Sequence, residues 1–240
     1  MTLGLAAIMP TSTMAAAYAS PQPPASHWIT STNYRYPGND GKHHAVSWDK
    51  YSYMIDDHHL NIWSGEVHYW RLPSPHQWRD VLQKMKAAGF NAVSFYFFWG
   101  YHQSAPDSPF DFSGIRNIDL LLRMAAEEGL YVIARPGPYI NAEISMGGMP
   151  AWQTNSSLPL RNAWDNTNWQ QQRAWLHAVN KIIARHQVTN GGGSVLLYQV
   201  ENEELASVGP YADYVKKIIK AAKEDGINAV SYTHLRAHET

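Results

Sequence analysis

From residue 59 onward, apolar runs and amphipathic helical patterns alternate along the chain. Residues 60–69 form an apolar run typical of a strand. Pro75, which is favoured at the first position of a helix, opens the next segment. Trp78, Leu82 and Met85 then recur at spacings of four and three, which places them on one face of a helix. The first unit that the pattern predicts is therefore a strand followed by a helix.

The same alternation recurs three more times. Strands are predicted over residues 90–98, 130–135 and 195–198, and the helices that follow them over residues 118–129, 166–187 and 210–226. Residues 139–165 show no clear period, and we expect this long segment to arch over the ends of the strands.

Four strand–helix units in strict alternation predict an α/β fold with a parallel sheet. A dinucleotide-binding or flavodoxin-like sheet would alternate in the same way, but it needs a glycine-rich phosphate turn after the first strand. Residues 70–75 read Trp-Arg-Leu-Pro-Ser-Pro there, and the glycines at 191–193 precede a strand instead. We therefore predict a (β/α)8 TIM barrel, of which this chain holds about the first four βα units.

Composition narrows the possible functions. The 240 residues are 45% hydrophobic and carry a net charge of −1, which gives no reason to expect nucleic acid or an anionic membrane as a partner. No apolar run is long enough to span a bilayer. Because the chain has no cysteine, disulfides, thiol catalysis and zinc–thiolate sites are excluded. Ten Trp and fourteen Tyr are either core residues or, in part, the lining of a carbohydrate cleft.

The first residues are typical of a signal peptide in some respects only. Residues 3–9 form a short apolar core, and Ala17-Tyr18-Ala19 offers the small-x-small pattern of a cleavage site. No Lys or Arg precedes Arg35, and Pro10 interrupts the apolar run. We expect residues 1–24 to be a signal peptide and linker, and the protein to be secreted; a disordered or wrongly assigned start is the alternative.

Polar and aromatic side chains lie in pairs at or just beyond the carboxyl-terminal ends of the predicted strands. The pairs are Glu66 and His68, Tyr96 and Trp99, Asn141 and Glu143, and Asn202 and Glu203. In a parallel barrel these ends converge on one face, where barrel enzymes keep their active sites. Carboxylates, amides and aromatic rings suit cleavage of a glycosidic bond, which needs one carboxylic acid and one carboxylate.

Several long stretches resemble glycoside hydrolase family 35, the β-galactosidases, in the order that the family has them. They are SGEVHYWR at 64–71, KMKAAGFN at 84–91, RPGPYINAE at 135–143, GGMPAW at 147–152 and QVENE at 199–203. The resemblance covers residues 45–228 and is similar in character to the secreted fungal members. It implies a retaining enzyme that acts on terminal β-D-galactose residues of an oligosaccharide or polysaccharide and uses no metal or organic cofactor.

The resemblance also implies roles for individual residues. Glu203 falls on the proton donor, and Asn202 on the residue that contacts the sugar 2-hydroxyl. Tyr96, Asn141, Ala142 and Glu143 fall on positions that bind the galactose ring. The nucleophile is a second Glu on the seventh barrel strand, which we expect beyond this chain. The chain by itself is therefore expected to be inactive.

Each role has a structural alternative. Glu201 is either a buried structural carboxylate or the true acid, Glu143 could be structural, and Glu66 is expected to pair with Arg71 at the barrel rim. The adjacent histidines at 43–44 and 58–59 lack the i, i+4 spacing of a metalloprotease site.

The resemblance completes a domain prediction. We expect the N-terminal half of the catalytic barrel over residues 25–228 and a non-native tail over residues 229–240. Two other functions fit the same residues: a barrel glycosidase for another β-linked sugar, and a non-catalytic galactose-binding protein.

Overall fold

A computed structural model of the chain describes residues 38, 40–155, 160–164, 166–203 and 209–232. All of them belong to one unit, which spans residues 36–240. The expected signal peptide and linker at residues 1–24 lie outside the described residues, as do residues 233–240 of the expected tail.

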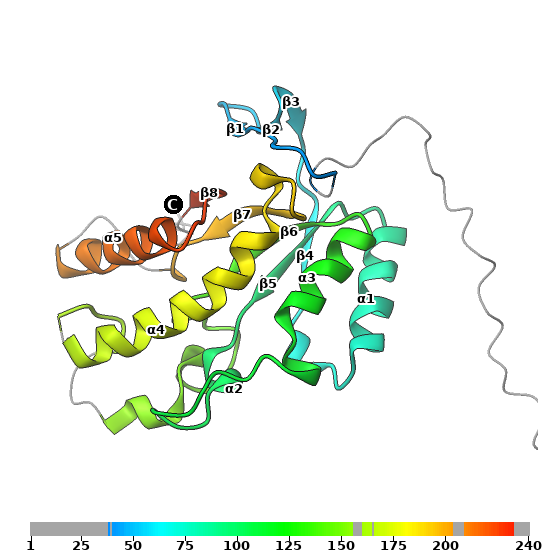
Figure 1. The fold of residues 1–240 in the computed structure, drawn as a ribbon. Helices are drawn as coiled ribbons and strands as arrows, with labels where there is room; N and C mark the ends of the chain where they lie inside the picture. Colours follow the sequence, from blue (N-terminus) through cyan, green and yellow to red (C-terminus); the bar gives the residue numbers. More distant parts are fainter. Residues whose placement is uncertain (1–37, 39, 156–159, 165, 204–208, 233–240) are drawn as a thin grey trace, which may run out of the picture. The chain divides into compact units, whose positions relative to one another are not determined.

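A parallel sheet forms the centre of this unit (Figure 1). Its strands are β4 (Ser64–Glu66), β5 (Ala92–Tyr96), β6 (Tyr131–Arg135), β7 (Val195–Gln199) and β8 (Val230–Tyr232). Each strand pairs in parallel with the next one along the chain, so the spatial order equals the sequence order. Sequential parallel order is the arrangement of a (β/α)8 barrel, and it confirms the predicted fold class as a partial barrel.

A helix follows each of the first four strands of this sheet. The helices are α1 (Pro75–Ala87), α3 (Ile118–Glu127), α4 (Asn166–Ile183) and α5 (Gly209–Glu224). Their apolar faces share one core with the outward side of the strands, where Trp78 and Trp175 lie against Val93, Phe95 and their neighbours with no exposed surface. Burial of these side chains supplies the main driving force for docking the helices.

The start of the fold differs from the prediction. Residues 60–69 are not one strand: β3 (His58–Leu60) ends at Leu60, and β4 starts only at Ser64. With β1 (Val46–Trp48) and β2 (Tyr53–Ile55), β3 forms a small antiparallel sheet. The β2–β3 turn is made by Asp56 and Asp57, both with positive φ, as a tight hairpin requires.

The small sheet closes the amino-terminal end of the barrel strands. Ile55 and Leu60 share a buried cluster with Ala92 and Tyr131, the first residues of β5 and β6. The opposite, carboxyl-terminal edge of the strands carries the loops that hold the candidate site.

Several short helices complete the described unit. They are α2 (Trp99–His102), η1 (Tyr69–Arg71), η2 (Gly114–Arg116), η3 (Ser145–Gly148), η4 (Ala151–Asn155), η5 (Ala184–His186) and η6 (Val188–Asn190). The helix predicted to reach residue 187 ends at Ile183, after which η5 tightens the chain. Strand β8 lies inside the range expected to be a non-native tail, and the origin of that tail stays a prediction. Among the described helices, none is both long and apolar enough to cross a lipid bilayer.

Candidate active site

The register of the parallel sheet brings candidate side chains together at its carboxyl edge. Tyr96, the last residue of β5, lies opposite Arg135, the last residue of β6. Glu66 ends β4 and lies opposite Ser94, two residues before Tyr96. Because alternate strand residues share a face, Glu66, Tyr96 and Arg135 project from the same side of the sheet.

Arg135 connects three of these side chains. Its Nη1 donates to Glu66 Oε2 at 2.6 Å, and its Nη2 donates to Asn202 Oδ1 at 2.8 Å. The guanidinium carbon lies 3.7 Å from the centre of the Tyr96 ring, a close cation–π contact. The Tyr96 hydroxyl in turn donates to Asn202 Oδ1 at 3.4 Å. One arginine therefore ties the ends of β4, β5 and β6 to the residue that follows β7.

Glu66 is charged in this arrangement. Partial burial raises its pKa, but the hydrogen bond to His68 and the positive charge of Arg135 outweigh burial and hold the pKa of Glu66 below its ordinary value. The imidazole Nε2 of His68 lies 2.9 Å from Glu66 Oε1, and the His68 ring stacks on Trp70 at 4.7 Å between centroids. The pair with Arg135 is thus a true ion pair at neutral pH.

The pKa of the Tyr96 hydroxyl is raised by burial and by nearby carboxylates. Burial raises its pKa, and the charge of Arg135 opposes that rise. Three carboxylates raise the pKa further through their negative charge, namely those of Glu66, Glu143 and Glu203. The carboxylates predicted near the ends of three different strands therefore all act electrostatically on the Tyr96 hydroxyl.

The three residues 141–143 form a turn of unusual backbone. Asn141, Ala142 and Glu143 all adopt left-handed φ angles, of 54°, 51° and 49°. Non-glycine residues seldom adopt this conformation, and a run of three needs support from its surroundings. Arg71 supplies part of it, because its Nη2 donates to the carbonyl of Ala142 at 2.9 Å. Ala142 is buried, whereas Glu143 is exposed.

Glu201 is a buried carboxylate with a cationic partner. Arg161 donates from Nε to Glu201 Oε1 at 2.8 Å and from Nη2 to Oε2 at 2.5 Å. The Glu201 side chain has no exposed surface, and it also accepts the backbone N–H of Asn202. These contacts favour the structural alternative for Glu201. Asn202 is buried, and Glu203, the next residue, is exposed.

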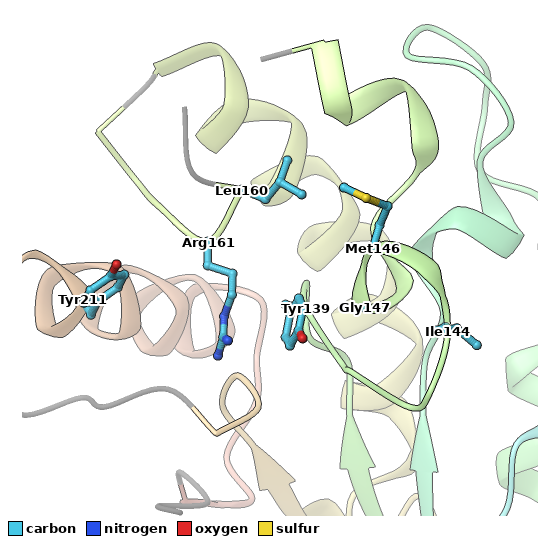
Figure 2. Close-up of a pocket in the computed structure, with 7 residues that line it drawn as sticks. All are labelled: Tyr139, Ile144, Met146, Gly147, Leu160, Arg161 and Tyr211. Atoms are coloured by element: carbon cyan, nitrogen blue, oxygen red, sulfur yellow. The ribbon is translucent and has the colours of Figure 1, made fainter. Parts of the chain in front are cut away.

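A pocket of about 680 Å³ is lined in part by Arg161 (Figure 2). Figure 2 shows the Arg161 side chain reaching toward the Tyr139 ring, and its guanidinium carbon lies 4.2 Å from the ring centre. Met146 and Tyr211 line other parts of the wall. Gly147 is required here, since a Cβ on it would lie 2.1 Å from the Tyr139 ring. The described lining includes none of the predicted site residues, but two lining residues contact them: Arg161 donates to the backbone carbonyl of Asn202, and Ile144 packs against the cluster that contains Tyr96 and Ala142.

Two sequence-based expectations are wrong. Glu66 pairs with Arg135 and not with Arg71, because Arg71 lies in η1 beyond the strand end and reaches the Ala142 carbonyl. Trp99 is not at the cleft: it has no exposed surface and donates its indole N–H to Gln103 at 2.7 Å within the helix-side core. His68 does lie at the rim, beside Glu66.

Two arginines that organise the site, Arg135 and Arg161, are not among the residues predicted from the sequence. Arg135 is the last residue of the predicted strand 130–135. The alternation pattern therefore already placed it at the carboxyl-terminal edge of the sheet, where the site lies. Arg161 lies in the aperiodic segment 139–165, where no pattern signals its pairing with Glu201 forty residues later. Within the described part of the chain, no group of three or more His, Cys, Asp or Glu side chains could hold a metal ion.

Solved structures with a similar fold include glycoside hydrolases. GH5_18 from Streptomyces cattleya in complex with GlcNAc aligns with a TM-score of 0.55 at 18% identity, over 72% of this chain and 44% of that chain. The exo-β-1,4-mannosidase Op5Man5 from Opitutaceae bacterium strain TAV5 aligns with a TM-score of 0.56 at 16% identity, over 73% of this chain and 32% of that one. At these identities the likeness concerns the fold alone.

Sequence relatives are closer. A protein from Aspergillus clavatus named "Probable beta-galactosidase C" is 47% identical over 193 residues, covering 78% of this chain and 19% of the relative. A protein of the same name from Penicillium rubens is 40% identical over 214 residues, covering 88% of this chain and 21% of the relative. This chain thus spans about a fifth of the length of these relatives. The model of Glycosyl hydrolases family 35 matches residues 52–239. The chain belongs to glycoside hydrolase family 35.

Proposed function

We propose that the whole protein hydrolyses terminal, non-reducing β-D-galactose residues with retention of configuration. The observation that carries the proposal is the strand-end cluster. Glu203 directly follows Asn202, whose side chain is fixed by Arg135 and Tyr96 at the carboxyl edge of the barrel. Family membership supports a glycosidase, and the name of the fungal relatives, probable beta-galactosidase C, supports galactose as the sugar.

Glu203 is the proposed acid–base residue. It donates a proton to the oxygen of the leaving sugar while a second Glu, expected on the seventh barrel strand, attacks the anomeric carbon. Glu203 then takes a proton from water, which hydrolyses the glycosyl-enzyme. Retention requires the two carboxyl groups to lie about 5 Å apart. The exposed position of Glu203 agrees with contact to solvent and substrate.

The galactose ring is held by the remaining residues of the cluster in this proposal. Tyr96, Asn141, Ala142 and Glu143 bind the ring, and Asn202 donates to the 2-hydroxyl. Amides, a phenol and a carboxylate at one edge provide the donors and acceptors that sugar hydroxyls need. No metal or organic cofactor takes part.

The test is a panel of nitrophenyl β-glycosides offered to the full-length protein. We expect the galactoside to be hydrolysed with the highest kcat/KM among galacto-, gluco-, manno-, xylo- and fuco-configured substrates. A preference for another sugar would favour a related barrel glycosidase. Calorimetric binding of galactose without any turnover would favour a non-catalytic galactose-binding protein.

We also propose that the protein is secreted. The support is the apolar stretch at residues 3–9 followed by Ala17-Tyr18-Ala19. Expression in a secreting yeast should yield extracellular protein whose N-terminus begins after residue 19. Removal of residues 2–19 should retain it inside the cell, and extracellular protein from that shortened version would contradict the proposal.

A further inference from the structure

The oxygen of the Asn202 side chain lies among three donors. Arg135 Nη2 is 2.8 Å away, Gln199 Nε2 is 3.3 Å away, and the Tyr96 hydroxyl is 3.4 Å away. The guanidinium and amide N–H groups can only donate, so the atom that faces them must be an acceptor. The orientation of the Asn202 amide is therefore fixed: its oxygen faces these three donors, and its NH2 group points away from them.

Arg135 is the strongest of the three donors. Its hydrogen bond to Asn202 is the shortest of the set, and its charge strengthens the bond. Gln199 Nε2 is shared, because it also donates to the Glu201 carbonyl at 2.9 Å. Removing Arg135 would therefore remove most of the preference for this amide orientation.

Arg135 is itself held on two sides. Glu66 accepts from Nη1 at 2.6 Å, and the Tyr96 ring lies against the guanidinium at 3.7 Å. The planar fork of arginine can serve both Glu66 and Asn202 at once, whereas the single ammonium of lysine is a point charge without that geometry. Lysine at this position would keep the charge but lose the two-armed support.

We infer that Arg135 is a positioning residue that, held by Glu66, orients the Asn202 amide so that its NH2 group faces the substrate 2-hydroxyl. This inference rests on the proposed function, because it needs a sugar in the cleft. Arg135 acts through Asn202 and does not touch the reacting atoms. The contact to the 2-hydroxyl strengthens in the transition state of retaining glycosidases, so a misoriented amide should lower the rate of glycosyl transfer.

The test compares two substrates on the full-length protein, nitrophenyl β-galactoside and its 2-deoxy analogue. Arg135→Lys should lower kcat/KM for the galactoside by about 10-fold or more, and for the 2-deoxy analogue by less than about 3-fold. Asn202→Ala should show the same pattern, and the double variant should be no worse than Asn202→Ala. If Arg135 had only a structural role, Arg135→Lys would lower kcat/KM for both substrates by the same factor.

Matched variants complete the design. Arg173→Lys alters an arginine outside this cluster, which forms two hydrogen bonds to the buried carboxylate of Asp225, and it should leave the ratio of kcat/KM between the two substrates unchanged. If Arg135→Lys does not fold, Glu66→Gln decides, since it weakens the hold on Arg135 and should shift the ratio in the same direction. An unchanged ratio in the folded variant overturns the inference. A parent protein without activity on the galactoside overturns the proposed function and the inference with it.

Discussion

Arg161 and Glu201 form a two-armed ion pair that ties the segment after β6 to the end of β7, with N–O distances of 2.8 and 2.5 Å. The same guanidinium donates to the backbone carbonyl of Asn202 at 2.5 Å. Glu201 has positive φ, and so has Glu203. The pair thus holds the bent backbone of residues 201–203, which includes Asn202 and Glu203, the two residues with proposed roles in the site.

Removal of Arg161 should lower the free energy of unfolding substantially. Arg161→Met takes the cation away from a carboxylate without exposed surface, and loss of one partner of a buried pair destabilises proteins by about 3–5 kcal/mol. Chemical denaturation of the full-length protein measures this loss. Arg161→Met combined with Glu201→Gln should be more stable than Arg161→Met alone, because the buried charge is gone.

Arg79→Met is the matched control for that measurement. Arg79 pairs with Glu127 and Glu128 between α1 and α3, where the side chains of Arg79, Glu127 and Glu128 are 35%, 52% and 16% exposed, against none for Glu201. Exposed pairs contribute about 1 kcal/mol or less. Equal losses for the two arginine variants would contradict a special role for the Arg161 pair.

Glu203→Gln should lower the hydrolysis rate much more for substrates with a poor leaving group than for those with a good one. A proton donor matters most when the leaving oxygen is a sugar alkoxide, so lactose hydrolysis should be abolished. Hydrolysis of dinitrophenyl galactoside should suffer less, and added azide should restore part of the turnover. Steady-state assays on the full-length protein check this. If Glu201→Gln shows the azide rescue and Glu203→Gln does not, the acid is two residues earlier than proposed.

The residues proposed to bind the galactose ring should each contribute strongly to kcat/KM for the galactoside. Alanine at Tyr96, Asn141 or Glu143 leaves sugar hydroxyls without partners, and we expect kcat/KM for the galactoside to fall by about 100-fold or more. Tyr51→Ala is the control, since Tyr51 is 75% exposed in the small amino-terminal sheet region. Near-parental kcat/KM in an alanine variant would remove that residue from the site.

His102 should make stability depend on pH. Burial lowers the pKa of this imidazole to about 4, and its two nitrogens are occupied by the Tyr69 hydroxyl at 2.5 Å and the Asp111 carbonyl at 2.7 Å. As pH falls below about 6.5, His102 binds a proton in the unfolded chain, whereas in the folded state it stays neutral until the pH is near 4. The free energy of unfolding should therefore fall by up to about 3 kcal/mol between pH 6.5 and 4.

His102→Gln isolates this effect. The gap in unfolding free energy between parent and variant, measured by denaturation at several pH values, should narrow as the pH falls. Tyr69→Phe removes a hydrogen bond but keeps the imidazole. The difference in unfolding free energy between the parent and Tyr69→Phe should therefore stay nearly constant over the same pH range. A constant gap for His102→Gln would show that His102 does not titrate as stated.

The sequence predicted those parts of the molecule that a repeating pattern encodes. Apolar strands and amphipathic helices identified β5, β6 and β7 and the helices around them, and strand ends identified Tyr96 and Asn202. The strands of the small sheet have three residues each, too few for a period of two to be recognised. The Arg161–Glu201 pair depends on tertiary proximity across forty residues. Trp99 follows a strand as a cleft residue would, but its large apolar ring is buried in the core.

The 240-residue chain expressed by itself should be inactive. Among the described strands, β4 pairs only with β5 and β8 only with β7, so each leaves an unpaired edge. Open edges and uncovered apolar surface promote aggregation. The proposed mechanism also needs a second carboxylate from the seventh strand of the barrel. We expect poor solubility or a molten state, and no hydrolysis of nitrophenyl β-galactoside above buffer, when this chain is assayed beside the full-length protein. Robust turnover by the 240 residues alone would contradict both the half-barrel interpretation and the two-carboxylate mechanism.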